Sequence, residues 1–124
     1  MFVYIAYRFN DTDAGKVLAN IGTAHRVGYE FIQKGDYPII PHSDFVMALM
    51  FGKKIPFDYY YKSTMEWMER CDAIAVVIDG EPLSNGVVAE LKRAIALKKK
   101  VYRAYINILT DDVKIEVWEQ PIAP

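Results

Sequence analysis

The chain has 124 residues, of which 52% are apolar in the wide sense and 25% are charged, with a formal net charge of −1. This length predicts one domain, residues 1–124, with a single hydrophobic core. The charge is balanced and interspersed, which argues against a nucleic-acid-binding surface.

The first third of the sequence predicts a strand, a helix and a second strand. Residues 2–6 are a continuous β-branched and aromatic run, typical of a strand buried on both faces. Turn and N-cap candidates follow at residues 10–13. Apolar residues then recur at steps of three and four from Val17 to Phe31, which predicts an amphipathic helix of about five turns. Residues 37–40 predict the second strand.

The remaining two thirds continue the alternation of strands and helices. Residues 42–56 are too apolar for an ordinary loop and predict a short helix or a lid. A helix is expected over residues 58–70, with Tyr61, Met65 and Met68 on its apolar side. The other predicted elements are strand 73–78, helix 85–98, strand 101–105 and an edge strand in the tail after residue 106.

Strands that alternate with helices predict βαβ crossovers, and therefore an α/β fold with a mainly parallel sheet of four to five strands covered on both faces. In such sheets ligands bind outside the carboxyl ends of the strands. The loops expected at that edge are residues 7–13, 41–43 and 79–86, and they carry most of the polar residues considered below.

Several classes of protein are not favoured by the sequence. A single cysteine, Cys71, excludes an intramolecular disulfide and fits a reducing compartment. His25, His42 and Cys71 show no metal-ligand spacing, so no metal is expected. The first residues do not resemble a signal peptide, and no apolar stretch approaches the ~20 residues that span a bilayer. We expect a cytoplasmic protein without a membrane partner.

Glu90 is the first candidate for a functional residue. It lies one and a half turns into the helix that follows the third strand, on the flank of the sheet-facing side. One interpretation is a boundary glutamate paired with Arg93 or Lys92. The other is a carboxylate aimed into a cleft, usable as a nucleophile or base.

The turn before that helix is the second candidate. Ser84, Asn85 and Gly86 are ordinary helix-capping and turn residues. The same hydroxyl and the free amides of the first helical turn would also bind a phosphate group. Sequence alone leaves both interpretations open.

Three further polar residues are candidates near the same sheet edge. Tyr4 lies in the first strand, and its hydroxyl needs a partner if the ring is buried; a carboxylate is one such partner. Arg8, just after that strand, is either solvated or a phosphate ligand. His42 follows a proline at the end of the second strand and either faces the cleft or packs.

Several of these segments together resemble the nucleoside 2-deoxyribosyltransferase superfamily, which includes the nucleoside 5′-monophosphate N-glycosidases. The resemblance covers roughly residues 2 to 105. Its most specific part is a cysteine–aspartate pair before an apolar strand, followed by a Ser-x-Gly-x-x-x-Glu helix start. The matching segments are residues 4–6, Gly35, residues 41–42, 65–77, 84–90 and 94–99.

This resemblance implies a single three-layer, flavodoxin-like (Rossmann-like) domain that cleaves or transfers an N-glycosidic bond. By resemblance, Glu90 attacks the anomeric carbon and forms a covalent glycosyl-enzyme, and Tyr4 orients Glu90. A serine at position 84 resembles the monophosphate glycosidases, in which it contacts phosphate. Asn85, Gly86, Arg8 and His42 are the other expected substrate-binding residues.

The resemblance further implies a nucleoside or nucleotide substrate, no cofactor, and a homodimer or higher homo-oligomer. Residues 45–51 are an apolar contact surface for such an assembly. One position departs from the family pattern: Thr64 replaces an aspartate that helps protonate the leaving base, and Asp58 or His42 would have to substitute. A non-catalytic nucleotide-binding or sensing module on the same fold is therefore the alternative, and a structural subunit with a vestigial cleft is a third.

Overall fold

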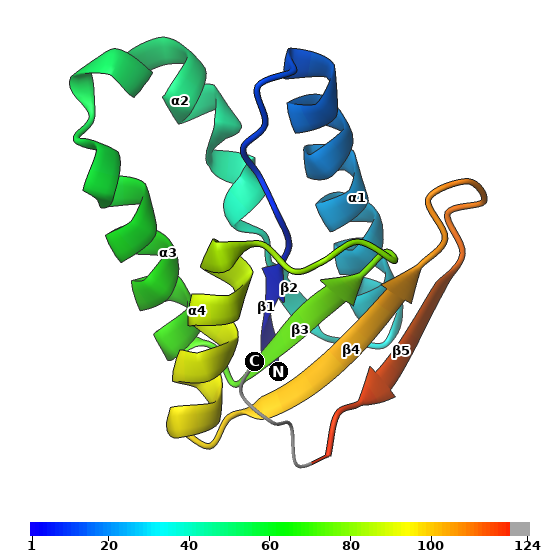
Figure 1. Ribbon diagram of the computed structural model, residues 1–124. Helices are drawn as coiled ribbons and strands as arrows, with labels where there is room; N and C mark the ends of the chain where they lie inside the picture. Colours follow the sequence, from blue (N-terminus) through cyan, green and yellow to red (C-terminus); the bar gives the residue numbers. More distant parts are fainter. Residues whose placement is uncertain (120–124) are drawn as a thin grey trace.

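The protein is built on one mixed sheet. The computed structural model describes residues 1–119, apart from the side chain of Phe57. Within these residues five strands follow the order β2-β1-β3-β4-β5 (Figure 1). The first four strands in chain order are parallel, and β5 is antiparallel to β4. The strands are β1 (Phe2–Ala6), β2 (Tyr37–Ile39), β3 (Ala73–Ile78), β4 (Lys100–Ile106) and β5 (Val113–Val117). The predicted α/β class and mainly parallel sheet are confirmed.

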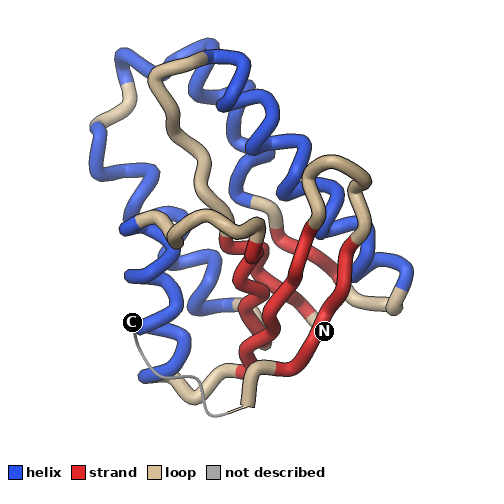
Figure 2. The backbone as a smooth tube through the Cα atoms, turned by 45° about the vertical axis from the view of Figure 1, so that its right-hand side comes forward, coloured by secondary structure: helices blue, strands red, loops and turns tan. Residues whose placement is uncertain are grey.

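Helices cover both faces of the sheet and make three layers. α1 (Ala14–Gln33) lies on one face, and α3 (Phe57–Arg70) and α4 (Asn85–Ala96) lie on the other (Figures 1 and 2). Phe31 and other apolar residues of α1 pack against Val3 and Ile5. On the opposite face, Met68 of α3 and Leu91 of α4 pack around Ile74. Burial of each such side chain stabilises the fold by about 1.5–3 kcal/mol.

Local capping sets the ends of the two helices that flank the site. The Asp13 side chain accepts a hydrogen bond from the Gly15 amide at 2.8 Å and begins α1. The Ser84 hydroxyl accepts from the Val87 amide at 3.3 Å and begins α4. α4 ends at Ala96, two residues before the predicted end, because Lys98 turns the backbone into the left-handed region with φ 58°.

The segment between β2 and α3 stands away from the sheet. It comprises the 3₁₀ turn η1 (Pro41–Asp44), helix α2 (Phe45–Phe51) and the 3₁₀ turn η2 (Gly52–Lys54) (Figure 1). The predicted short helix is thus confirmed, and none of its seven residues is buried. Tyr61 of α3, predicted to pack, is 56% exposed. The prediction was wrong because the first half of α3 extends beyond the core, whereas Met65 and Met68 pack as expected.

The tail predicted as an edge strand is β5, which continues the sheet beyond β4. Its Val113 and Ile115 pack against the core beneath α1. Across residues 1–119, no helix is both long and apolar enough to cross a membrane.

Candidate active site

The topology creates a switch point between β1 and β3. From β1 the chain passes through α1 to β2 on one side, and from β3 it passes through α4 to β4 on the other. The loop after β1 (residues 7–13) and the loop after β3 (residues 79–84) therefore flank a crevice at the carboxyl edge, where ligands bind in open α/β sheets.

Glu90 and Tyr4 lie together beneath this edge, on the α3–α4 face. Glu90 is 8% exposed and Tyr4 is 1% exposed. The Tyr4 phenol lies next to the Glu90 carboxyl group and the Thr64 hydroxyl group of α3, and both groups affect the pKa of Tyr4. Three elements, β1, α3 and α4, thus bring one residue each to a buried polar cluster. Thr64 also donates a hydrogen bond to the Tyr60 carbonyl oxygen at 2.9 Å.

Burial controls the protonation of this cluster. It raises the pKa of Glu90 from 4.5 to about 7, and the hydrogen bond from Tyr4 opposes this rise. Burial, and then the charge of Glu90, raise the pKa of Tyr4 far above 10. Tyr4 therefore stays a hydrogen-bond donor, while Glu90 is about half ionised at neutral pH.

The alternative pairing of Glu90 with Arg93 or Lys92 is not found. Arg93 Nε donates instead to Glu69 Oε1 of α3 at 2.7 Å. Lys92 is exposed, whereas Glu90 faces inward. The neighbour that affects the Glu90 carboxyl group is therefore the Tyr4 phenol and not a surface cation.

The turn before α4 carries hydrogen-bond donors that are partly or fully exposed to solvent. Ser84 is partly buried and caps the helix, while Asn85 and Gly86 are exposed. A Cβ atom built on Gly86 meets no atom within 4 Å, and its backbone φ is not positive. Packing and conformation within the protein therefore do not require glycine there, and the backbone at Gly86 is open to solvent.

Arg8 is engaged with Asp79, the first residue after β3. Its Nη2 atom donates to Asp79 Oδ1 at 3.1 Å, and its Nη1 atom contacts Asp79 Oδ2. The Tyr7 hydroxyl donates to Asp79 Oδ2 at 2.7 Å. Burial would raise the pKa of Asp79, but hydrogen bonds from Arg8, the Glu81 amide and Tyr7 outweigh it and lower the pKa to about 2. Sequence reasoning missed Tyr7 and Asp79, although an acidic residue directly after a buried parallel strand is a usable signal.

His42 is a buried residue beneath the loop after β1. It is 2% exposed, its Nε2 atom lies 2.9 Å from the Arg8 carbonyl oxygen, and its ring packs edge-on against Phe9. Its Nδ1 atom has no partner among the described residues. Burial lowers the pKa of His42, so the neutral ring donates from Nε2 to the carbonyl oxygen. This arrangement makes His42 a packing residue and a poor proton donor for a leaving base.

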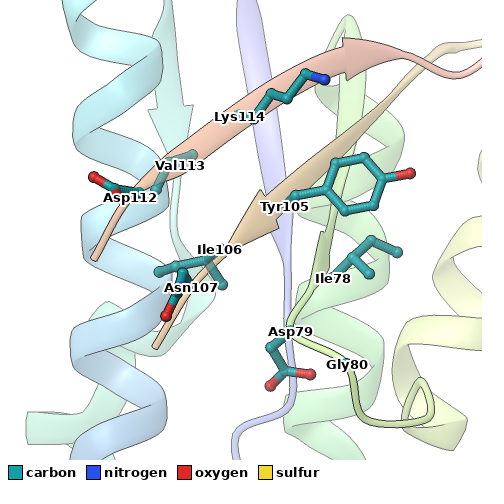
Figure 3. A pocket seen from close by; sticks show the side chains of 9 residues that line it. All are labelled: Ile78, Asp79, Gly80, Tyr105, Ile106, Asn107, Asp112, Val113 and Lys114. Carbon is teal, nitrogen blue, oxygen red and sulfur yellow. The ribbon is translucent and has the colours of Figure 1, made fainter. Parts of the chain in front are cut away.

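Two cavities open at the carboxyl edge. One, of about 490 Å³, is lined by Arg8, Lys16, Asn20 and Glu81 and lies at the switch point. The other, of about 440 Å³, lies over the ends of β3 and β4 and the start of β5. Figure 3 shows Ile78, Tyr105 and Lys114 in this second cavity, on three neighbouring strands. Glu90 and Tyr4 line neither of these two cavities.

Over residues 1–119, no group of three or more histidine, cysteine, aspartate or glutamate residues is placed to hold a metal ion.

Most of the chain matches one known protein family. A family model described as a domain of unknown function, DUF7768, matches residues 1–104. The chain belongs to the DUF7768 family. No curated protein matches the chain. The description of the DUF7768 family names no chemistry, so the resemblance to nucleoside deoxyribosyltransferases stays a prediction. The matched region of this DUF7768 domain contains Tyr4, Thr64, Arg8, Asp79 and Glu90.

Proposed function

We propose that this protein cleaves or transfers the N-glycosidic bond of a nucleoside 5′-monophosphate or related nucleoside, on a flavodoxin-like (Rossmann-like) fold. The observation that carries the proposal is the buried Tyr4–Glu90 pair at the side of a helix whose first residues, Asn85 and Gly86, are exposed. Glutamate carboxylates act as nucleophiles in glycosidases, and a buried one beside a phenol is suited to that role.

In the proposed reaction Glu90 acts in its ionised form. One carboxylate oxygen forms a bond to the anomeric carbon as the bond from that carbon to the base nitrogen breaks, and the base takes the electron pair. Water, or an N–H nitrogen of a second base, then attacks the anomeric carbon and releases the carboxylate. The attacking group gives up one proton, which balances the proton that the departed base takes from solvent. Tyr4 holds the carboxylate in place by donating a hydrogen bond. With a pKa of about 7, Glu90 is a stronger base than an exposed glutamate and is still half ionised at neutral pH.

The phosphate group is proposed to bind at the N-terminus of α4. Ser84 and the amides of the first turn are donors there, and the helix dipole favours a negative charge. The open space at Gly86 allows the phosphate to approach the backbone. A neutral hydroxyl at position 84 tolerates a dianion, which a carboxylate would repel.

Position 64 is a threonine, where the resembled family has the acid that protonates the leaving base. The hydroxyl group of Thr64 lies beside Tyr4 and is not an acid at neutral pH, so it cannot donate a proton to the leaving base. Asp58 lies in the first turn of α3, is 61% exposed and pairs with Lys62. It is too solvated to replace the missing acid, and loss of acid catalysis costs about 10²–10⁴-fold in rate.

This loss favours the alternative, a nucleotide-binding or sensing module that does not turn over its ligand. A chemical assay separates the two functions. The protein is incubated with a panel of (deoxy)nucleosides and their 5′-monophosphates, and free base is followed by chromatography. Glycosidase activity predicts base release that disappears in Glu90→Gln and persists in Glu66→Gln, a matched control because Glu66 is 61% exposed. Saturable binding without release over long incubation supports the sensor.

We further propose that copies of the chain associate through α2, as a homodimer or higher oligomer. The helix carries no charge, and its exposed large apolar residues range from 43% to 68% exposed. An uncharged apolar patch of this kind marks an interaction surface, and a second identical patch is its natural complement.

A further inference from the structure

Three side chains link the ends of β1 and β3. Arg8 donates to both carboxylate oxygens of Asp79, and Tyr7 donates to one of them at 2.7 Å. Arg8 Nη1 also donates to the Tyr7 hydroxyl oxygen at 2.7 Å. The Asp79 side chain is only 4% exposed and that of Arg8 is 26% exposed, so the carboxylate end of this link is shielded from water and the pair is screened less by salt than a surface ion pair.

The link extends to the neighbouring backbone on both sides. Asp79 Oδ1 accepts a hydrogen bond from the Glu81 amide at 2.9 Å, which fixes the start of the loop after β3. The Arg8 carbonyl oxygen accepts from His42 Nε2 at 2.9 Å, which ties in the segment after β2. The carboxyl ends of β2, β1 and β3 are thereby connected side by side.

The charges in this link do not suit a phosphate ligand. The guanidinium group of Arg8 is neutralised by a carboxylate that it contacts through two nitrogen atoms. A phosphate approaching Arg8 also approaches the negative charge of Asp79, which opposes binding. The geometry thus suits an internal support better than a ligand contact.

We infer that Tyr7, Arg8 and Asp79 form a clamp that holds the loop of residues 79–84 against the end of β1 and so positions Ser84 and the first turn of α4. The clamp is a property of the ligand-free protein. Its consequence for a ligand, the placement of the phosphate donors, rests on the proposed function.

Hydrogen exchange of the ligand-free protein tests the clamp directly. The amides of Val87 and Val88 bond to the Ser84 hydroxyl and carbonyl oxygens at 3.3 and 3.0 Å, so they report on the start of α4. The variants are Arg8→Met, Asp79→Asn and the double variant. We expect each single variant to exchange these amides about tenfold faster, and the double variant to be no faster than the more affected single variant, because both remove the same link.

Two further variants keep the exchange test decisive. Tyr7→Phe removes the two hydrogen bonds of the Tyr7 hydroxyl but no charge and leaves the Arg8–Asp79 pair in place, so it disturbs folding less and should give a smaller increase in exchange. Arg70→Met removes an arginine from an exposed pair with Glu66 and should leave the two amides unchanged. Unchanged exchange in the clamp variants, or additive effects in the double variant, would overturn the inference.

Calorimetry of adenosine 5′-monophosphate binding shows whether Arg8 belongs to a clamp or binds phosphate directly. The two roles predict opposite changes of affinity in Asp79→Asn. If Arg8 and Asp79 form a clamp, Asp79→Asn should displace the phosphate donors at Ser84 and the first turn of α4 and weaken binding, by up to ~10²-fold. If Arg8 instead binds the phosphate directly, Asp79→Asn should strengthen binding, because it frees the guanidinium group of Arg8. Tighter binding would overturn the clamp. If neither adenosine 5′-monophosphate nor the other nucleotides of the panel bind, the proposed function fails, and exchange alone decides the clamp.

Discussion

The pH dependence of stability is a direct consequence of the buried position of Glu90. In the folded protein its pKa is about 7, against 4.5 for an ordinary glutamate. Between these pH values the unfolded chain has released a proton that the folded protein keeps, so stability falls as pH rises. At about 1.4 kcal/mol per pKa unit, the loss between pH 4.5 and pH 8 is roughly 3 kcal/mol. Below pH 4.5 both states are protonated and the penalty is absent.

Glu90→Gln removes this titration and keeps the shape of the side chain. We expect the variant to match the wild type near pH 4.5 and to exceed its free energy of unfolding by roughly 3 kcal/mol at pH 8. Urea unfolding at four pH values, followed by tryptophan fluorescence, measures the difference, and groups common to both proteins cancel. The exposed Glu66→Gln is the matched control. A difference between wild type and Glu90→Gln that stays constant with pH would refute the reasoning.

Three further substitutions test other parts of the site and surface. Tyr4→Phe removes the phenol hydroxyl group that lowers the pKa of Glu90, so the midpoint of the pH–rate profile for base release should move to higher pH. An unmoved midpoint contradicts this. Gly86→Ala should raise stability slightly, by up to about 1 kcal/mol in urea unfolding, yet weaken nucleotide binding in calorimetry; unchanged affinity would show that the phosphate lies elsewhere. Leu49→Glu, at 68% exposure, should convert an oligomer to monomer in light scattering without loss of helicity, and an unaltered mass rejects α2 as the interface.

Most of the fold follows from hydrophobic patterning. The continuous apolar runs at β1 and β3 predict buried parallel strands, and they are the most buried strands of the sheet. The errors arise where backbone geometry or tertiary position overrides the pattern. The left-handed Lys98 ends α4 early, and Tyr61 faces solvent because α3 extends past the core. The antiparallel direction of β5 depends on the tight turn between Asn107 and Asp112, which weak alternation alone did not indicate.

The candidate site is predictable only in part. A strand phenol that needs a partner and a glutamate on a helix flank suggest the Tyr4–Glu90 pair, and the structure places these residues together. The sequence gives no sign that Arg8 bonds to Asp79, because 71 residues separate them and each alone suits a solvated or ligand-binding role. Such a pairing follows from the sheet order, which places β1 beside β3.

The limit of the family match falls inside a strand. Residues 1–104 end within β4 (Lys100–Ile106), whereas β5 pairs with β4 from Tyr102 to Ile106. A recombinant protein trimmed to the matched region would lose β5 and leave β4 as an open edge with unpaired amides and carbonyls. It would also uncover the apolar surface that Val113 and Ile115 protect. The open edge of β4 could pair with the same edge of another copy and cause aggregation. Expression and crystallisation should therefore use a chain that extends at least through Val117.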